Sequence, residues 1–502
     1  MCPTTFKKFF IAGASSLLLF SCQKGLKEAN TLLSEKSNAA KDKINVNNDK
    51  INFENKSVTP SFVKMLPGFE NVGIYTLITG DDVLPQSPDF VYGAQPDGQG
   101  FLKNPDGEGY IMINNHEILQ SVSRVYLDKQ LNPLKGEYIV NASGGMWRLC
   151  SGTMATPQEH GFGPVFLTAG ESGPDSRVHA INPFGSVEDR SRTDRVIPAL
   201  GRASMENAVP LPKDAYRGKT VIIIGEDDSN GQVILYVSNT VGDLQNGKLY
   251  FLRRTNQDAV ETDMAVGSTY DVEFVEIDNA KTATGAEIAA QSVAKKAVQF
   301  ARVEDLDYRK GGGANSRELY FVSTGVANVT GKTMWGRVYQ LKLDEKDPLK
   351  GKLTPIRDGG INPGNDLINP DNVTATENYV YILEDGDSFY PAAKHDSWVW
   401  QYNIATGEFK PFITMDHRRN DPVFNSAAEN GGYNQSGNNH RFGSWEFGAM
   451  TDISKETKVE GTFLLNIHPH TWRKRRFLNA DGTNVTNNSE GGQTVILTGV
   501  PR

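Results

Sequence analysis

The sequence predicts an all-β protein and, within that class, a β-propeller with a short helical insertion. Three features lead to this prediction. Short β-rich runs recur past residue 60, helical periodicity is scarce, and acidic and amide residues stand where the runs begin or end. A propeller protects the sheet edges of a long all-β chain and gathers such strand ends at one mouth of its central channel. A pair of β-sandwiches is the competing architecture, because the chain has no fixed-period repeat of the WD40 or kelch kind.

The first 22 residues resemble the signal peptide of a bacterial lipoprotein. Lys7 and Lys8 precede an apolar run that is too short for a stop-transfer helix, and the run ends in LLLFSC, which resembles a lipobox. In such a signal Cys22 is acylated and becomes the first residue of the mature chain. An ordinary secretory signal cleaved near the same point is the alternative. We therefore expect a protein of the bacterial cell envelope, anchored to the outer membrane through the lipid on Cys22 and facing the periplasm or the cell exterior.

A flexible tether is expected over residues 23–58. This segment is rich in Lys, Asn, Glu and Ser and nearly free of aromatic residues. Such a composition buries too little apolar surface to offset the entropy that is lost on ordering. A short helix around residues 26–33 is the alternative for part of it. The predicted propeller domain then spans residues 59–502.

Within this domain, runs of about the length of a strand alternate with clusters of Gly, Asn, Asp and Pro. Residues 283–301 carry Ala, Ile, Val and Phe at helical spacing, and we expect the helical insertion there. The runs that we expect to be strands are residues 109–115, 123–129, 163–170, 219–228, 232–239, 248–254, 270–277, 318–325, 336–343, 378–386, 398–404 and 461–467.

The charge balance limits the choice of partners. The formal net charge is −8 at pH 7. This argues against nucleic acid as a partner, because a phosphate backbone requires a basic protein face. Acidic side chains are instead available to bind hard cations.

Cys150 is the cysteine whose presence requires an explanation. The chain has three cysteines, and Cys2 and Cys22 lie in the export signal, so Cys150 would be the single thiol of the mature protein. An unpaired thiol in an exported protein is open to oxidation and mispairing. It could be a buried small hydrophobic residue or a nucleophile, although no histidine lies nearby in GTMATP. We favour a metal ligand, because a metal-bound thiolate is protected and useful.

Several carboxylates stand at the ends of the predicted strands. Glu206, in GRASMENAVPL, has apolar residues on both sides, where an unpaired charge is costly. Gathered at one channel mouth, such residues would form an oxygen-rich site for Ca²⁺ or a ferric ion. Arg302, two residues before Glu304, would then hold an anionic oxygen with its planar guanidinium group. The candidate acidic residues are Glu117, Glu171, Glu206, Asp227, Asp228, Glu304, Glu384 and Asp385.

These segments, taken in order, resemble motifs of the PhoX-type alkaline phosphatases. GRASMENAVPL with the three runs that follow it is similar to the central block of that family, and INNHE is similar to its "NHE" element. The resemblance extends from about Asn115 to His470. This chain differs at Met205 in the "HE" motif, at Gly170 in "CEE" and at His470 in "HPG". The other matching segments are LCSGTMATP with FLTAGES, FARVEDLDY, INPDNVTATENYVYILEDGD and EFGAMTDISKETKVEGTFLLNIHPH.

The resemblance implies a six-bladed propeller with a di-iron and calcium centre at its mouth. Cys150, Glu206 and Glu304 match the iron ligands of the family, and Arg302 matches the arginine that contacts phosphate. Glu171 matches a calcium ligand. The metal ligands expected for Fe³⁺ and Ca²⁺ are therefore Cys150, Glu117, Glu171, Glu206, Asp228, Glu304 and Asp385, the last of which matches the aspartate of the family's "TDG" motif.

The function that the resemblance implies is hydrolysis of small phosphate esters by a monomer, monoesters first and diesters second. Ferric ions would polarise the phosphoryl group, calcium would fix the geometry, and Arg302 would hold an equatorial oxygen. One alternative is a non-catalytic, calcium-stabilised surface propeller that binds glycans or protein partners, with Trp398, Trp400 and Trp472 as contact residues. Another is a calcium-only phosphatase like the propeller phytases, which would leave Cys150 unexplained.

Overall fold

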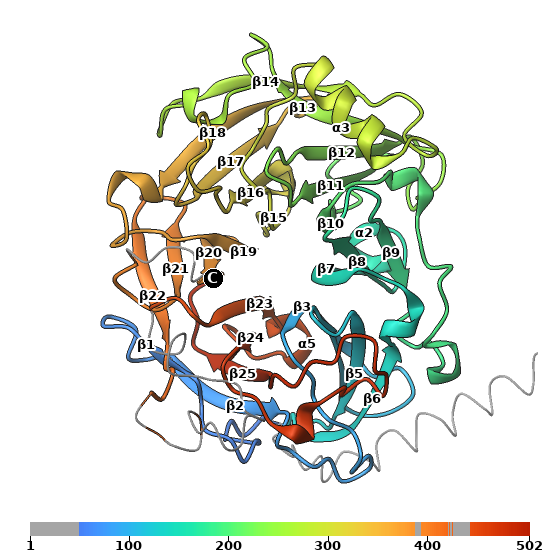
Figure 1. The fold of residues 1–502 in the computed structure, drawn as a ribbon, viewed down its shortest axis with the longest axis vertical. Helices are drawn as coiled ribbons and strands as arrows, with labels where there is room; N and C mark the ends of the chain where they lie inside the picture. Colours follow the sequence, from blue (N-terminus) through green and yellow to red (C-terminus); the bar gives the residue numbers. More distant parts are fainter. Residues whose placement is uncertain (1–49, 387–392, 420, 422–423, 425–441) are drawn as a thin grey trace, which may run out of the picture. The chain divides into compact units, whose positions relative to one another are not determined.

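Antiparallel β-meanders surround a central axis in the computed structural model, which describes residues 50–386, 393–419, 421, 424 and 442–502 (Figure 1). The prediction of an all-β propeller is confirmed. The predicted signal peptide with Cys22, and residues 23–49 of the predicted tether, lie outside the described residues. Among the residues that are described, no helix has both the length and the apolar character needed to span a membrane.

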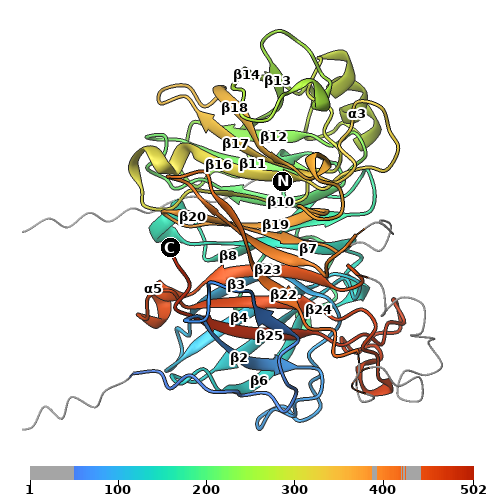
Figure 2. The same cartoon turned by 90° about the vertical axis from the view of Figure 1, so that its left-hand side faces the viewer.

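Each blade has its first strand next to the axis and its later strands further out (Figures 1 and 2). The strands of the first three blades, from the axis outward, are β3 (Pro96–Lys103), β4 (Tyr110–His116), β5 (Ser121–Leu127) and β6 (Pro133–Val140); β7 (Arg148–Ala155), β8 (Val165–Glu171) and β9 (Val178–Ile181); and β10 (Met205–Pro210), β11 (Thr220–Glu226), β12 (Val233–Ser238), β13 (Lys248–Arg254) and β14 (Tyr270–Glu276).

The last three blades follow the same plan, and two of them take their outermost strand from the N-terminal segment. Their strands are β15 (Leu306–Tyr308), β16 (Glu318–Ser323), β17 (Arg337–Leu343) and β18 (Lys350–Asp358); β19 (Pro370–Ala375), β20 (Tyr379–Glu384), β21 (Trp398–Asn403), β22 (Phe409–Met415) and β1 (Val63–Met65); and β23 (Glu446–Asp452), β24 (Phe463–His468), β25 (Gln493–Thr498) and β2 (Gly73–Thr79).

The third and fourth blades are joined at the rim into one nine-stranded sheet. Their outermost strands, β14 and β18, pair antiparallel, with Tyr270 opposite Leu353 and Val272 opposite Gly351. Counted as separate meanders, the two halves of this sheet and the four other sheets give six blades, in agreement with the number that the resemblance implies.

The ring is closed by strands from opposite ends of the chain. Strand β2 pairs with β25, which places Gly73 opposite Thr498 (Figure 1). Packing against the blades is already present before the predicted domain boundary at residue 59. Ile51 is buried among the core residues of the first and last blades, and the Lys56 amide donates a 2.7 Å hydrogen bond to the Thr76 carbonyl. The packed domain therefore includes residues 51–58, which the sequence assigned to the tether.

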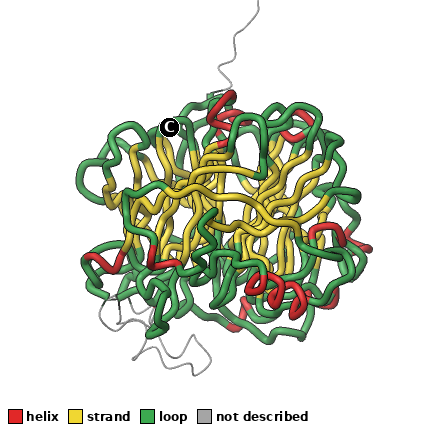
Figure 3. Tube along the Cα trace, turned by 90° about the horizontal axis from the view of Figure 1, so that it is seen from above, coloured by secondary structure: helices red, strands yellow, loops and turns green. Residues whose placement is uncertain are grey.

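The apolar runs in the sequence arise because the middle strands are covered on both faces. In β11, Ile222 and Ile224 pack into the core shared with the second blade, while Val221 and Ile223 pack into the core shared with the fourth. Successive side chains of a strand point to opposite faces, so a strand between two neighbouring blades is apolar at every position. Figure 3 shows these strands running between two ends of the molecule that are covered by loops.

The predicted helical insertion is present but shorter than expected. Helix α3 spans Gly285–Ala294 rather than residues 283–301. A capping box between Thr284 and Glu287 begins it, and Ile288 packs it on the rim of the third blade. The other α-helices among the described residues are single turns, α2 (Pro157–His160) and α5 (Ser454–Thr457), and short 3₁₀ segments lie at Ala142–Gly144, Val187–Asp189, Pro198–Leu200, Glu261–Asp263, Gly313–Arg317, Gly359–Ile361 and Arg475–Phe477.

The N-terminal segment is attached to the last blades by an aromatic cluster. Phe62 is fully buried, with ring centroids 5.2 Å from Trp445 and 5.0 Å from Trp472, both in edge-to-face arrangements. Because β1 and β2 flank this cluster, its packing holds the strands that close the ring.

We expect Phe62→Ala to lower the free energy of unfolding by about 3–5 kcal/mol, because a buried aromatic side chain would be replaced by a cavity. Equilibrium unfolding in urea measures the loss. Val58→Ala, in the same segment at a residue that is 79% exposed, is the control and should change stability little. Equal stability of the two variants would show that the aromatic cluster does not secure the closing strands.

A candidate metal centre at one mouth of the channel

The six innermost strands bring their first residues to the same mouth of the channel. Four of them have a register shift at this point in their pairing with the second strand, and the shift spans the acidic or thiol residue. A β-bulge of this kind leaves a residue out of the ladder and redirects its side chain. The residues contributed by the six strand starts are Asp97, Cys150, Glu206, Glu304, Asp371 and Glu446.

A second set of side chains comes, in four of the blades, from the strand next to the innermost one. These strands run in the opposite direction, so they end where the innermost strands begin. Glu117 follows β4, Glu171 ends β8, Asp227 follows β11 and Asp385 follows β20. The turns after the second strands therefore form an outer ring around the residues of the inner strands.

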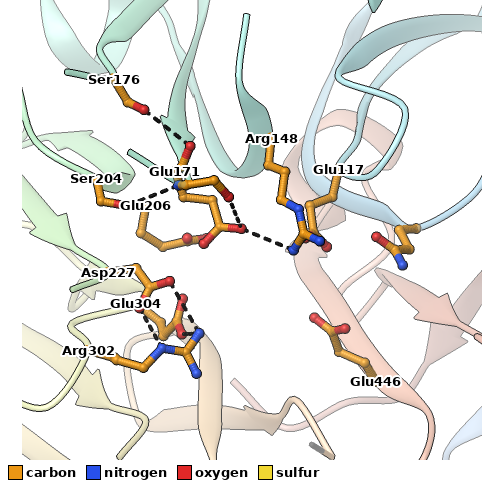
Figure 4. Close-up of polar contacts among 12 residues, drawn as sticks. Glu117, Arg148, Glu171, Ser176, Ser204, Glu206, Asp227, Arg302, Glu304 and Glu446 are labelled. Atoms are coloured by element: carbon orange, nitrogen blue, oxygen red, sulfur yellow. Dashed lines mark hydrogen bonds and ion pairs between the residues drawn. The ribbon is translucent and has the colours of Figure 1, made fainter. Parts of the chain in front are cut away.

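Apart from Asp227, the residues of the two sets line a cavity of about 380 Å³ (Figure 4). Eight carboxyl groups and one thiol surround it, against two guanidinium groups and one imidazole. Most of these carboxylates are buried, and buried carboxylates so close together cannot all ionise unless cations lie among them. The geometry therefore makes this cavity a candidate metal centre. The lining residues are Gln95, Asp97, Glu117, Arg148, Cys150, Glu171, Glu206, Arg302, Glu304, Asp371, Asp385, Glu446 and His470.

Cys150 belongs to two of the candidate metal-binding triads. Its Sγ lies within 4.8 Å of ligand oxygens of Asp97 and Glu117 on one side, and of Glu171 and Glu206 on the other. Burial, followed by the surrounding carboxylates, raises the pKa of the thiol well above its usual value. Without a cation this residue stays protonated and is a poor nucleophile. A bound metal ion would reverse that balance, because a coordinating thiol is deprotonated.

Glu206, Glu304 and Asp371 form a further triad on three consecutive innermost strands. The Ser151 amide donates a 2.9 Å hydrogen bond to Glu206 Oε1. Glu206 Oε2 and Asp371 Oδ1 are buried, and no hydrogen-bond donor among the described residues reaches them. Burial raises the pKa of Glu304 to about 8, although Arg302 opposes the shift. Buried carboxylate oxygens without donors are the observation that best fits a bound cation here.

Arg302 points its guanidinium group into the same cavity (Figure 4). Its Nε donates a 2.6 Å hydrogen bond to Asp227 Oδ1, and its Nη2 lies 2.5 Å from Glu304 Oε1. Within the described part of the chain Nη1 has no partner. Its backbone has a φ of 66°, which is unusual for a residue other than glycine, and the Arg302 amide donates to the Asp228 carbonyl. One edge of the guanidinium group is thus fixed and the other is available to an anion.

Arg148 is a second cationic group at this mouth. Its Nη1 lies 2.9 Å from Glu117 Oε1 and 3.5 Å from Glu171 Oε1, and its side chain is 44% exposed (Figure 4). It stands two residues before Cys150, where β7 begins. Arg148 and Arg302 both also line a shallower neighbouring cavity, which opens beside Glu171.

The structure brings most of the predicted residues together. Cys150, Glu117, Glu171, Glu206, Glu304, Asp385 and Arg302 all line the cavity. Asp228 does not. Its exposed carboxylate accepts a 2.9 Å hydrogen bond from the Asn230 amide within its own turn, and the preceding residue, Asp227, faces Arg302 instead. The lining residues that were not predicted from the sequence as site residues are Gln95, Asp97, Arg148, Asp371, Glu446 and His470.

The aromatic residues of the glycan-binding alternative are not arranged as contact residues. Trp400 is 4% exposed and Trp472 is 1% exposed. The partly buried Trp398 is stacked on His395, with ring centroids 3.6 Å apart. Packing accounts for these three side chains.

Solved structures with a similar fold include PhoX of Pseudomonas fluorescens in complex with vanadate, a transition-state analogue. It matches with a TM-score of 0.58 at 14% identity, over 89% of this chain and 98% of that chain. A calcium-binding protein, regucalcin, from Agrobacterium tumefaciens matches with a TM-score of 0.36 at 10% identity, over 82% of this chain and 94% of its own. No protein-family model and no curated protein matches the sequence. At 14% identity, the likeness to PhoX establishes a shared fold.

We expect the protein, freed of metal by a chelator, to lose thermal stability as the pH rises from about 4.5 to about 8. Glu304 ionises near pH 4.5 in the unfolded chain but only near pH 8 in the folded one, so the folded state binds the extra proton over this range. The stability that this proton provides is complete below pH 4.5 and is lost as the pH rises.

Differential scanning calorimetry at a series of pH values measures this effect. The melting temperature should fall by roughly 5 °C or more across the range, and less in Glu304→Gln, which cannot ionise. A melting temperature of the wild type that rises or stays constant over the same range would contradict the account.

Proposed function

We propose that this chain is a PhoX-like, metal-dependent phosphatase that hydrolyses phosphate monoesters first and diesters second. The observation that carries the proposal is the convergence of Cys150, Glu206, Glu304 and Arg302 on one cavity, in a fold shared with PhoX. A thiol and several carboxylates provide ligands for cations, and a guanidinium group with a free edge provides a place for an anion. Substrate hydrolysis at such a centre needs both.

The residues present fit the expected metals. Ferric ions bind thiolate and carboxylate ligands, and Ca²⁺ binds carboxylate oxygens alone. Cys150, Glu206 and Glu304 would hold iron, and Asp371, which has an otherwise unsatisfied oxygen, forms a triad with Glu206 and Glu304. Glu171 would hold calcium. When bound, these ions act as Lewis acids that draw charge from the phosphoryl oxygens and lower the pKa of a coordinated water.

The two arginines bind and orient the substrate. Arg302 is held by Asp227 and Glu304 through Nε and Nη2, so its Nη1 can donate to a phosphoryl oxygen without reorganising. Arg148 provides a second positive group across the cavity (Figure 4). Because both guanidinium groups are already paired with carboxylates, they lose little side-chain entropy when the substrate binds.

The proposal extends to the location of the enzyme. We propose that it acts as a monomer at the bacterial outer membrane, tethered through a lipid on Cys22. The lipobox-like LLLFSC segment supports this anchoring. The structure describes the chain from Lys50 onward, and the packed domain begins at Ile51, so up to 28 residues separate Cys22 from the domain.

We expect Cys150→Ser to lower the iron content and the hydrolysis of p-nitrophenyl phosphate together, because a hydroxyl group is a much weaker ligand for iron than a thiolate. Plasma emission spectroscopy measures iron and calcium in the purified proteins, and absorbance at 405 nm measures the hydrolysis. Full iron content and full activity in Cys150→Ser would refute the proposed centre.

Arg302→Lys is expected to lower kcat/KM by about 100-fold or more, because lysine cannot keep its contacts with Asp227 and also donate to the substrate. Arg309→Lys is the matched control. Arg309 makes a similar ion pair with Glu318, at 3.3 Å, but follows the far end of β15. Equal activity of the two variants would remove Arg302 from the substrate site.

A further inference from the structure

We propose that Glu446, His468 and His470 form a separate site for a divalent first-row transition metal ion, with zinc as the natural fit, beside the cysteine–carboxylate centre. The site would use two imidazole nitrogens and one carboxylate oxygen. It adds to the proposed phosphatase function and does not depend on it. Among the candidate metal-binding triads of the described residues, this is the one that contains nitrogen donors.

The backbone places the three side chains together. Glu446 begins β23 and His468 ends β24, and the two residues are directly opposite each other in the sheet. The His470 amide donates a 3.0 Å hydrogen bond to the His468 carbonyl, and this tight turn brings the second imidazole back over the sheet end. Glu446 Oε2 then lies 3.1 Å from His468 Nδ1 and 3.0 Å from His470 Nε2.

The outer nitrogen of His468 is fixed by a backbone acceptor. His468 is fully buried, and its Nε2 lies 2.9 Å from the carbonyl oxygen of Pro96. A carbonyl can only accept, so Nε2 carries the hydrogen. The inner nitrogen, Nδ1, is buried and has no hydrogen bond, although it faces Glu446. This arrangement, with one ring N–H on a backbone carbonyl and the other nitrogen directed inward, is the usual one for a metal-binding histidine.

His470 has a comparable support. Its Nδ1 lies 3.3 Å from Glu490 Oε2 and 3.1 Å from Gln95 Nε2. Gln95 Nε2 donates a 2.8 Å hydrogen bond to the same Glu490 oxygen, and Arg473 holds the other oxygen of Glu490. The tautomer that donates from Nδ1 to Glu490 leaves Nε2 with a lone pair directed toward Glu446 Oε2. Carboxylate–histidine pairs of this kind orient the imidazole and raise its basicity as a ligand.

The distances suit a small ion. Tetrahedral ligands at about 2.1 Å from an ion stand about 3.4 Å from one another. The oxygen–nitrogen separations of 3.0 and 3.1 Å need to grow by only a few tenths of an ångström. Three protein ligands leave the fourth position open, and Glu446 and His470 both line the cavity that holds Arg302. The open position would therefore face the proposed substrate site.

The competing explanation is a proton in place of the ion. Two doubly protonated imidazoles around one carboxylate would give the same short contacts. A direct measurement of imidazole coordination separates the two, because only a metal ion gives the bound imidazole N–H groups a paramagnetic shift.

The test adds Co²⁺ to the full chain carrying Cys150→Ser, a background that removes the thiolate. Proton NMR should show two exchangeable, strongly shifted N–H signals, one from each imidazole. In the same background, His470→Ala should weaken the affinity of this site for Co²⁺ by about 100-fold or more. At the Co²⁺ concentration that saturates the parent, the variant should therefore show neither shifted signal. Equilibrium dialysis should show that it binds one Co²⁺ ion fewer than the parent.

His179→Asn is the control, since His179 is a buried histidine in β9 with no hydrogen bond among the described residues, and it should keep both signals. Glu446→Gln provides a second disruption of the site should His470→Ala fold poorly. The proposal would be overturned if the parent showed no shifted imidazole signals. It would also be overturned if both disrupted variants bound as many Co²⁺ ions as the parent. The parent carries Cys150→Ser and is expected to lack phosphatase activity. If it still shows the shifted imidazole signals, the histidine site exists independently of the proposed function.

Discussion

The concentration of acidic side chains around one buried cavity is the constraint on which the rest of this molecule depends. Eight carboxyl groups and a thiol face two guanidinium groups and one imidazole. Burial raises the pKa values of Asp97, Cys150, Glu206 and Asp371 well above their usual range, which means that without cations these side chains favour their protonated, uncharged forms. Cations change this balance, because they stabilise the ionised forms that metal binding requires.

The propeller fold makes it possible to bring so many acidic side chains together at one cavity. Each innermost strand contributes one acidic or thiol residue at its start, so no strand carries the whole electrostatic cost. The blades behind them are apolar on both faces, as in β11, and closure of the ring by β2 fixes all six strand starts against one another. Bulges at the strand starts then turn the ligand side chains inward without disturbing the ladders further along.

The sequence predicts the outer parts of the blades far better than the inner ones. Each of the twelve expected runs corresponds to a second or later strand of a blade, whose apolar residues repeat clearly. None corresponds to an innermost strand. β3 reads PDGQGFLK and β19 reads PDNVTA, because strands that line a polar channel lack the apolar pattern by which strands are recognised.

The same reason explains the site residues that were missed. Asp371 begins β19 in an Asp-Asn pair that parallels Glu206-Asn207 in β10, and this repeated acid–amide pair is a signal that could have identified it. Asp97 and Glu446 have no such pair in the sequence, and only the ring brings them beside Cys150 and His468. Which of the two neighbouring aspartates, Asp227 or Asp228, belongs to the site depends on the conformation of a turn. Asp228 accepts a hydrogen bond from the Asn230 amide within that turn, and Asp227 faces Arg302.

The central claim is that the cluster at the channel mouth is an iron-containing centre built on Cys150. Crystallographic diffraction data collected just above and just below the iron absorption edge test it most directly. The account predicts an anomalous difference peak within bonding distance of Cys150 Sγ and of carboxylate oxygens of Glu206. A cavity with no iron peak beside Cys150, in protein purified without chelators, would contradict it.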